Sequence, residues 1–440
     1  MNGISLLRAL VGLAVLVAIA WVFSSDRRRI PWRTVGIGLA LQIVLAIFLL
    51  HGRTLGAFFG PLAWPSIFFR WISSLFVFVL RFTAEGARFV FGDLALGPGE
   101  TGSLGQFFAF QVLPTIIFFS SLMAILYHAG VMQRIVRAMG WVVSRVLRTS
   151  GAESLAVAAN IFVGQIEAPL VIRPFLAGLT RSELLAVMAG GMATIAGGVM
   201  AAYVQMLGSA FASTQGVPLD GARLLFAEHL LAASVMAAPA ALLLSKIVLP
   251  ETSEPETLNV VRVGYERTSR NVIDAAATGA GEGLKLALNV GAMLLAFIAL
   301  IALVNALLGW GAGLFGATLT LQQLFGWVLA PIAWIVGVPW ADAVSFGGLL
   351  GTKVVLNEFV AYLGLAEGIQ GATLLPKTVL MATFALCGFA NFSSIAMQIG
   401  GIGSLAPSRT SEIAELGLRA VLIGMLANLM TATIAGGLLA

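Results

Sequence analysis

Two glutamates lie within sequence that is otherwise apolar. Glu167 belongs to the segment NIFVGQIEAPLVIRPF, and Glu358 belongs to GTKVVLNEFVAYLGL. A carboxylate is costly to bury, and at membrane depth such a group usually belongs to a substrate or ion pathway. Both glutamates are therefore candidate binding groups. The structural alternative is that Glu358 pairs with Lys353 and that Glu167 caps a half-helix.

Uncharged polar residues accompany the two carboxylates. Gln165, Asn391 and Ser394 offer hydrogen-bond donors and acceptors without net charge. Such a set suits a neutral solute that is rich in hydroxyl groups. Phe389 and Phe392 flank Asn391, and each ring either lines a pocket or packs in the interior.

A second polar group has the character of an ion site. The Asn160 amide, the Thr194 hydroxyl and the backbone around Val163 and Ile195 supply hard oxygen ligands without a carboxylate. Such ligands suit a monovalent cation better than a divalent one. The alternative is that Asn160 caps a broken helix and that Thr194 bonds back to its own helix.

Other metal, redox and nucleic-acid chemistry is not indicated. Cys387 is the one cysteine, which excludes an internal disulfide and a CxxC motif. The three histidines are scattered along the sequence. The 25 Lys and Arg residues exceed the 20 acidic residues only slightly, and in a membrane protein this excess reports orientation. We expect no nucleic-acid partner and no enzyme activity.

The composition is that of an integral membrane protein. Of the 440 residues, 59% are hydrophobic and 10% are charged. A spanning helix needs about 20 apolar residues, and eight windows meet this need. They are residues 5–25, 34–51, 104–128, 184–210, 230–249, 286–308, 378–403 and 414–439. The fold class expected is therefore an all-α polytopic membrane protein with eight transmembrane helices.

Two further segments, 152–180 and 342–366, are apolar but have polar centres. Each arm has about ten apolar residues and is long enough for half a bilayer. Pro169 and Gly164 favour a non-helical centre in the first segment. We interpret both segments as re-entrant hairpins. Because each precedes a span that is rich in small residues, the pattern indicates inverted repeats with a binding site near the bilayer midplane.

The remaining segments complete the layout. Residues 61–91 and 132–147 are apolar but carry arginines, so we expect interfacial helices there. With eight spans, the Lys and Arg clusters all fall on one side, which places both termini outside the cytoplasm. The expected parts are scaffold spans in 1–130, a first transport half in 131–249, a cytoplasmic linker with an interfacial helix in 250–283, a scaffold span with an external segment in 284–340, and a second transport half in 341–440.

These motifs together resemble a known family. The segments NIFVGQIEAPLVIRPFLAGLTRSELLAVMAGGMATIAGG, GTKVVLNEFVAYLGL and FANFSSIAMQIGGIGSLAPSR are similar to the signature segments of the concentrative nucleoside transporters. The eight-span layout is similar to the bacterial members. The resemblance implies a sodium-coupled nucleoside symporter that forms a homotrimer in the bacterial inner membrane. It also implies a scaffold that holds a moving domain built from the two hairpins.

The resemblance further assigns roles to the candidate residues. Gln165 and Glu167 would bind the nucleobase, and Phe389 would pack beside the nucleoside. The ribose hydroxyls would be held by Glu358, Asn391 and Ser394. The sodium ion would be bound by the Asn160 side chain, the Thr194 hydroxyl and the carbonyls of Val163 and Ile195.

One residue departs from the family pattern. Ile166 stands where the family usually has threonine, so a hydroxyl is lost on the side that faces the base. An apolar wall rejects analogues less strongly than a polar group that must be satisfied. We hypothesise that this protein discriminates less among bases, purine or pyrimidine, than its relatives.

Three alternatives remain open at this point. Coupling to protons would use Glu358 or Glu167 as the group that takes up the proton. An intramembrane enzyme would use the two glutamates as acid and base, but no nucleophile or metal cluster accompanies them. A passive channel or a ligand sensor would use the same scaffold without concentrating the solute.

Overall fold

The computed structural model describes residues 3–97, 102–105, 107–258 and 269–439, and every regular element in these ranges is a helix. The first half contains α1 Gly3–Val22, α2 Trp32–Gly56, η1 Gly60–Ala63, α3 Trp64–Phe91, η2 Gly92–Ala95, α4 Phe108–Gln111, α5 Leu113–His128, α6 Val131–Leu147, α7 Gly151–Asn160, η3 Ala168–Gly178, α8 Arg181–Ala193, α9 Gly197–Gln215 and α10 Leu219–Val248. The second half contains α11 Val272–Gly313, α12 Leu321–Ile335, η4 Trp340–Asp342, α13 Ala343–Val355, α14 Glu358–Gln370, α15 Pro376–Ala385, α16 Phe392–Leu405, η5 Pro407–Arg409 and α17 Thr410–Leu438.

Eight stretches of the described residues are long and apolar enough to cross a membrane. The number equals the expected one, but the membership differs. The stretch Gly60–Ala95 is long and apolar enough to span a membrane, whereas the sequence predicted an interfacial helix at 61–91. The expected span 378–403 does not qualify, because α15 and α16 divide it into two short helices.

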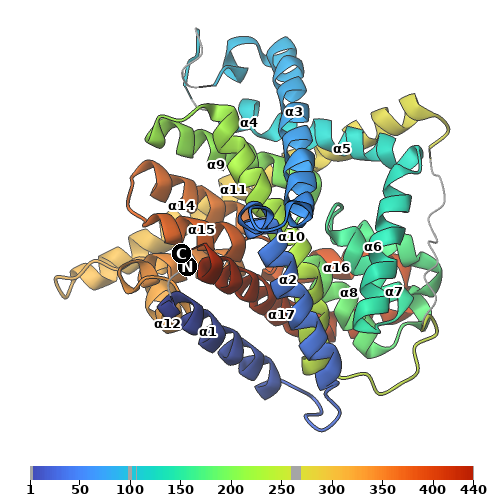
Figure 1. The fold of residues 1–440 in the computed structure, drawn as a ribbon. Coiled ribbons are helices and arrows are strands. Elements are labelled where there is room, and N and C mark those ends of the chain that lie inside the picture. The colour runs from blue at the N-terminus through green and yellow to red at the C-terminus, as the bar shows by residue number, and fades with distance from the viewer. Residues whose placement is uncertain (1–2, 98–101, 106, 259–268, 440) are drawn as a thin grey trace.

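The most buried stretches form the centre of the molecule. In Arg181–Gln215, Leu219–Val248 and Pro407–Leu438, 94%, 94% and 89% of the most apolar window is buried, against 28% in α1. Figure 1 shows α10 and α17 crossing the middle of the fold, with α1 along α17 and the two termini side by side. The outer helices thus enclose α8, α9, α10 and α17.

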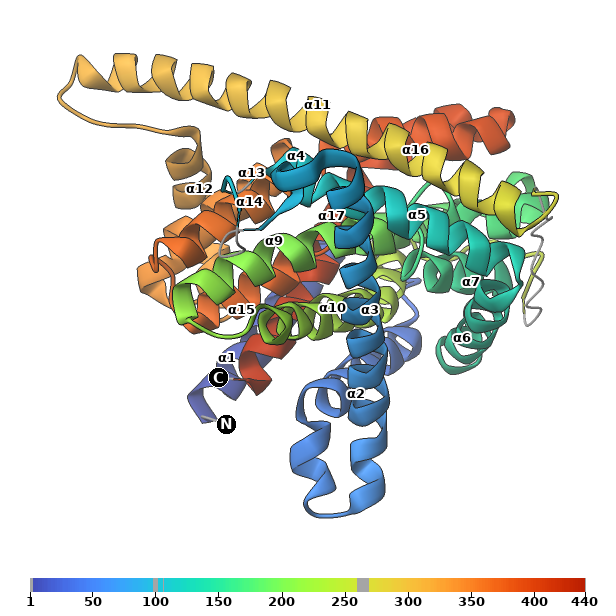
Figure 2. The same ribbon diagram turned by 90° about the horizontal axis from the view of Figure 1, so that it is seen from above.

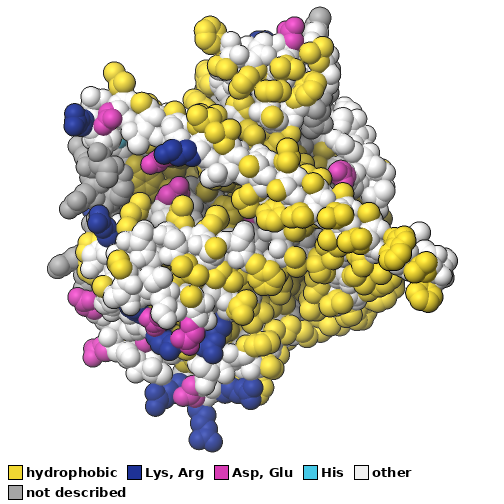
Figure 3. Space-filling view, turned by 180° about the vertical axis from the view of Figure 1, so that it is seen from behind, with side chains coloured by type: hydrophobic (Ala, Val, Ile, Leu, Met, Phe, Trp, Pro, Cys, Tyr) yellow, Lys and Arg dark blue, Asp and Glu magenta, His cyan; other side chains and the backbone are white. Residues whose placement is uncertain are grey.

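The outer surface has the character of a membrane protein. Figure 3 shows a broad region of apolar side chains, while most of the Lys, Arg, Asp and Glu side chains on this face lie away from it. Large exposed side chains such as Trp71, Phe78 and Leu295 contribute to the apolar surface of the molecule. Apolar exposure on this scale is expected where lipid or another subunit covers the protein.

Helix α11 is longer than expected. The sequence predicted an interfacial helix within 250–283 and a separate span at 286–308, whereas the structure has one 42-residue helix from Val272. Part of the expected linker, residues 259–268, lies outside the described residues. At 1.5 Å per residue α11 is about 63 Å long, roughly twice the hydrocarbon thickness of a bilayer. Figure 2 shows it crossing the molecule over α5 and extending beyond the other helices.

Two helical hairpins occupy the expected places. The first consists of α7 and η3, and the second consists of α13 and α14. Their arms have 10 to 13 residues, which is half of the length needed to span a bilayer. The chain turns between α7 and η3 at 161–167, and Pro174 lies inside η3 next to a kink at Ile172.

The open end of the first hairpin begins and ends at capping boxes. The Ser150 hydroxyl accepts from the Glu153 amide at 3.3 Å, and Glu153 accepts from the Ser150 amide at 2.9 Å. Thr180 and Glu183 repeat this pattern at the start of α8, with distances of 3.1 and 2.8 Å. Each box satisfies orphan amides at the start of a helix, so both helices have sharply defined first turns.

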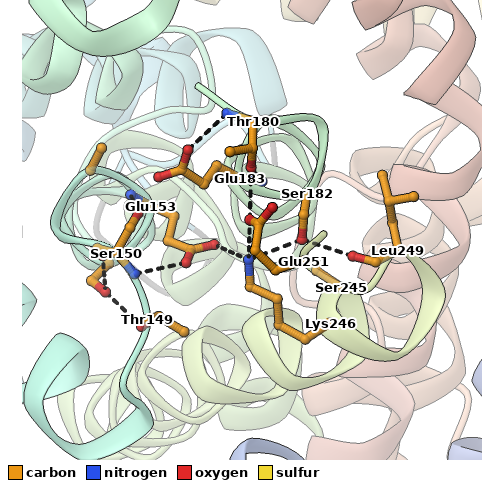
Figure 4. A network of polar contacts seen from close by, with 12 residues as sticks. Thr149, Ser150, Glu153, Thr180, Ser182, Glu183, Ser245, Lys246, Leu249 and Glu251 are labelled. Atoms are coloured by element: carbon orange, nitrogen blue, oxygen red, sulfur yellow. Dashed lines mark hydrogen bonds and ion pairs between the residues drawn. The ribbon is translucent and has the colours of Figure 1, made fainter. Parts of the chain in front are cut away.

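A buried ion-pair network ties these two helix starts to the end of α10 (Figure 4). The Lys246 ammonium lies 2.8 Å from Glu153 Oε2 and 3.6 Å from Glu251 Oε2, and it donates to Ser182 Oγ at 3.0 Å. Lys246 and Glu153 are both nearly inaccessible. Removing one partner of such a pair would leave a buried charge, so the network holds the base of the hairpin firmly against α10.

Both spans that follow the hairpins are broken. Residues 194–196 interrupt the helix between α8 and α9, and residues 386–391 interrupt it between α15 and α16. Asn391 caps α16, because its Oδ1 accepts from the Ser394 amide at 2.9 Å. A hairpin followed by a broken helix therefore occurs once in each half.

Candidate functional site

A hydrogen bond joins the tip of the first hairpin to the second broken helix. Gln165 Nε2 donates to Ser394 Oγ at 2.9 Å. Gln398, one turn further along α16, donates to Gln165 Oε1 at 3.0 Å and to the Met188 carbonyl at 2.9 Å. Gln165, Ser394 and Gln398 are all buried. The Gln165 amide is therefore held by two side chains of α16, one of which, Gln398, also bonds to α8.

Glu358 lies at the other end of the same polar cluster. Its Oε2 accepts from Asn391 Nδ2 at 2.8 Å, and its Oε1 accepts from the Tyr203 hydroxyl at 3.1 Å. The Glu358 side chain is 4% exposed, at the start of α14. Neutral donors from α9 and from the break before α16 thus orient the carboxylate, and no ion pair joins it to Lys353 within 4.0 Å. The structural alternative, in which Glu358 pairs with Lys353, is therefore not seen.

The aromatic residues beside Asn391 differ in exposure. Phe389 is 9% exposed and Phe392 is 47% exposed. The first ring lies in the interior next to the polar cluster, whereas the second reaches the surface at the start of α16. Phe389 is accordingly the better placed of the two to line a pocket.

The tip of the first hairpin presents Ile166 and Glu167 outward. Both residues are exposed. The Glu167 carboxylate accepts a hydrogen bond from the Gly164 amide and does not join the polar cluster around Glu358. The carboxylate does not cap η3. Ile166 lies against α16, since a Cβ on Gly401 would be only 2.5 Å from its Cγ2. The two candidate base-binding groups of the hairpin therefore differ in direction. Gln165 points into the interior toward α16, and Glu167 lies at the surface.

The candidate ion ligands lie where the first hairpin meets the first broken helix. Gly197 donates its amide to the Phe162 carbonyl at 3.0 Å, which holds the hairpin tip against the break. The Asn160 side chain is 1% exposed, and neither its amide nitrogen nor its oxygen has a hydrogen-bond partner. The structural alternative, in which the Asn160 side chain caps the broken helix, is thus not seen. A buried amide without a partner is costly and fits a group that binds an ion.

Thr194 behaves partly as the structural alternative predicted. Its hydroxyl donates to the Gly190 carbonyl at 3.0 Å. The hydroxyl oxygen keeps lone pairs for an ion, because a donated proton does not use them. Val163 and Ile195 are both buried. Val163 follows Phe162 and Ile195 lies two residues before Gly197, so both are close in sequence to the hydrogen bond between Gly197 and Phe162. These three residues, Thr194, Val163 and Ile195, and Asn160 are the four ligands that the sequence indicated, and they lie at this junction.

The two helix breaks touch each other. Gly388 has φ +119°, and a Cβ at this position would lie 2.7 Å from the carbonyl group of Ala193. Asn428 on α17 donates Nδ2 to the Ala193 carbonyl at 2.7 Å and accepts from the Lys353 ammonium at 2.7 Å. Lys353 also donates to the Ala385 carbonyl at 3.0 Å. The ends of α8 and α15 are thereby linked through two polar side chains.

Four residues of this site were not singled out as binding or positioning groups from the sequence. They are Tyr203, Gln398, Asn428 and Lys353. Their common signal is a polar side chain that is fully buried within apolar sequence. Such residues require partners, but the partners come from other helices and are not visible along the chain.

Family models match nearly the whole chain. Residues 11–94 match the sodium-dependent nucleoside transporter N-terminus, residues 109–210 match the nucleoside recognition (Gate) model, and residues 229–436 match the sodium-dependent nucleoside transporter C-terminus. The chain therefore belongs to the concentrative nucleoside transporter family. It is a multi-pass membrane transporter and not an enzyme.

Individual relatives agree with this assignment. An uncharacterized transporter of Bacillus subtilis is 46% identical to this chain. The match covers 98% of this chain and 99% of the relative. The nucleoside permease NupC of Helicobacter pylori is 43% identical, with 98% and 97% covered. Sodium/nucleoside cotransporter 1 of Rattus norvegicus is 39% identical, with 97% of this chain and 62% of the relative covered.

Solved structures agree with the fold. The structure of CNTnw in an inward-facing substrate-bound state is 43% identical and has a TM-score of 0.83, with 98% of this chain and 97% of that chain covered. A CNTnw variant in an outward-facing state has a TM-score of 0.87, with 99% and 98% covered. The all-helical fold class predicted from the sequence is thus confirmed.

The contact between the two breaks can be tested with glycine substitutions. Gly388→Ala should lower the melting temperature of the purified protein, because the new Cβ would overlap the Ala193 backbone and because φ +119° strains any other residue. The expected cost is about 1–3 kcal/mol. Gly400→Ala is the matched control, since Gly400 lies within α16 and a Cβ there meets nothing within 4 Å. Equal melting temperatures for the two variants would contradict the close contact.

Proposed function

We propose that the protein is a sodium-coupled symporter that imports nucleosides by alternating access. The observation that carries this proposal is the buried Asn160 amide, which has no protein partner beside the first helix break. The similarity to sodium-dependent nucleoside transporters supports it. Sodium is here a transported substrate, and its ligands would be Asn160, Thr194 and the carbonyls of Val163 and Ile195.

The nucleoside would occupy the cluster that joins the two hairpins. Glu358, Asn391 and Ser394 would bind the ribose hydroxyls, since they already exchange hydrogen bonds that hydroxyl groups can replace. Gln165 would bind the base, and Phe389 would pack against the nucleoside. Glu167 is exposed at the hairpin tip and would reach the base directly or through water.

The wider assembly belongs to the same proposal. The two hairpins would be re-entrant, and they would move with the helices after them against a scaffold formed by the early spans and α11. The exposed apolar face of α11 is consistent with a homotrimer in the bacterial inner membrane. Both termini, which lie side by side, would be outside the cytoplasm.

Uptake into proteoliposomes tests the coupling ion. Radiolabelled uridine and adenosine should accumulate under an inward sodium gradient and not under a proton gradient alone. Asn160→Ala should weaken sodium dependence and nucleoside affinity together, because the coupling between two ligands of one protein is reciprocal. Normal sodium dependence in Asn160→Ala would reject the proposed ion site. Accumulation with protons alone would transfer the coupling to a carboxylate.

Tyr203 should position Glu358 for the nucleoside. Tyr203→Phe removes the hydroxyl that donates to Oε1, and a hydrogen bond to a charged group contributes about 1.5–3 kcal/mol. The apparent affinity for nucleoside should fall about tenfold or more. Tyr362→Phe is the matched control, because the neighbouring Tyr362 hydroxyl donates to the Thr383 carbonyl at 2.8 Å instead. Equal losses of affinity in binding titrations of the two variants would contradict a special role for Tyr203.

Ile166 should determine how strictly bases are distinguished. Ile166→Thr places a hydroxyl on the exposed hairpin tip, and a hydrogen bond contributes about 1 kcal/mol. The ratio of the inhibition constants for adenosine and uridine should therefore change about fivefold. Leu170→Thr, a similar change at an exposed position of η3, should leave the ratio unchanged. Strict selectivity in the unmodified protein that Ile166→Thr does not alter would refute the hypothesis.

A further inference from the structure

Lys353 is a fully buried cation that the proposed transport mechanism does not yet use. The side chain is 0% exposed on α13, the first arm of the second hairpin. A buried ammonium is costly unless its three donors find partners. Lys246, the other buried lysine described above, pairs with a carboxylate. Lys353 does not have such a pair within 4.0 Å among the described residues.

Two neutral oxygens accept hydrogen bonds from the ammonium instead. Lys353 Nζ donates to the Ala385 carbonyl at 3.0 Å and to Asn428 Oδ1 at 2.7 Å. Ala385 is the last residue of α15, so its carbonyl belongs to the negative end of a half-helix. Uncharged carbonyl and amide oxygens at a helix break are the ligands that membrane transporters offer to a monovalent cation. The Lys353 ammonium therefore has the same kind of oxygen ligands that a bound monovalent cation would have.

The first half has a corresponding arrangement with one difference. Ala193 is the last residue of α8, next to a helix break, and the buried side chain from the first hairpin is the neutral Asn160. The amide of Asn160 has no partner, whereas the ammonium of Lys353 has two. One hairpin thus brings a neutral ligand to its broken helix, and the other brings a positive charge.

Asn428 connects the two arrangements. Its Oδ1 accepts from Lys353, and its Nδ2 donates to the Ala193 carbonyl at 2.7 Å. The orientation of this amide is determined by chemistry, since an ammonium can only donate and a carbonyl can only accept. The charge on Lys353 therefore acts on the end of α15 directly and on the end of α8 through one side chain.

We propose that the Lys353 ammonium is a tethered cation, which serves the second broken helix as the transported ion serves the first. Lys353 is then a positioning residue that fixes the break before Asn391 and, through Asn391, the carboxylate of Glu358. Because one of the two cation positions is filled by the protein itself, each nucleoside would require one mobile ion. This inference rests on the proposed symport function, which supplies the ion at the first hairpin.

The test is the sodium dependence of uridine uptake into proteoliposomes by Lys353→Met. Without the tethered charge, a second ion from solution should take its place. The Hill coefficient for sodium should rise from about 1 toward 2, and the sodium concentration for half-maximal uptake should rise at least tenfold. Uridine affinity at low sodium should fall about tenfold and should recover at high sodium. Lys353→Gln, which keeps a donor but not the charge, should behave in the same way if the methionine variant folds poorly.

Two control variants separate this role from a structural one. Lys353→Arg keeps the charge and should keep a Hill coefficient near 1. Lys246→Met removes a buried lysine that is ion-paired at the hairpin base, so it should lower the melting temperature without changing the Hill coefficient. A Hill coefficient near 1 in both Lys353→Met and Lys353→Gln, or a loss of uptake that high sodium does not relieve, would overturn the tethered cation.

Failure of the symport proposal would give a different result. If protons alone drive uptake by the unmodified protein, sodium coupling is wrong, and the role of Lys353 is then read from equilibrium binding of uridine. A tethered cation predicts that Lys353→Met and Lys353→Gln bind uridine at least tenfold more weakly than Lys353→Arg. Equal uridine affinity in these three variants would overturn the inference independently of the coupling ion.

Discussion

The need to satisfy buried polar groups is the constraint on which the rest of this structure depends. Each helix break in the interior exposes carbonyls and amides that no longer have partners within their own helix. The protein meets this need with side chains from distant elements, such as Asn428 for Ala193 and Lys353 for Ala385. The breaks are therefore stable only while the hairpins, α17 and the broken helices remain assembled.

The same constraint explains why the candidate site is shared between the two halves. Gln165 from the first hairpin needs a partner, and Ser394 and Gln398 on the second broken helix provide it. Glu358 from the second hairpin needs donors, and Tyr203 on α9 is one of them. Each half completes the polar groups of the other. A ligand that replaced these bonds would consequently contact both halves at once.

The sequence predicted the elements more completely than it predicted their partners. The hairpins at 151–178 and 343–370 could be predicted because Glu167 and Glu358 interrupt apolar runs that are too short to span a bilayer. The continuity of α11 could not be predicted, because no local sequence feature distinguishes an interfacial helix followed by a span from one long helix. Gln398 and Asn428 were missed because an isolated amide in an apolar helix has meaning only through the distant group that it contacts.

The contact between the two helix breaks gives a physical route for coupling an ion to a solute. An ion bound by Asn160 and Thr194 would stabilise the first break, where Gly388 of the second break lies against Ala193. The second break leads directly to Asn391, which donates to Glu358. Closely packed groups of this kind transmit small shifts because they cannot deform without losing contacts. Ion occupancy at one hairpin would therefore change the geometry of the carboxylate at the other, and by linkage a solute bound to that carboxylate would strengthen ion binding by the same factor.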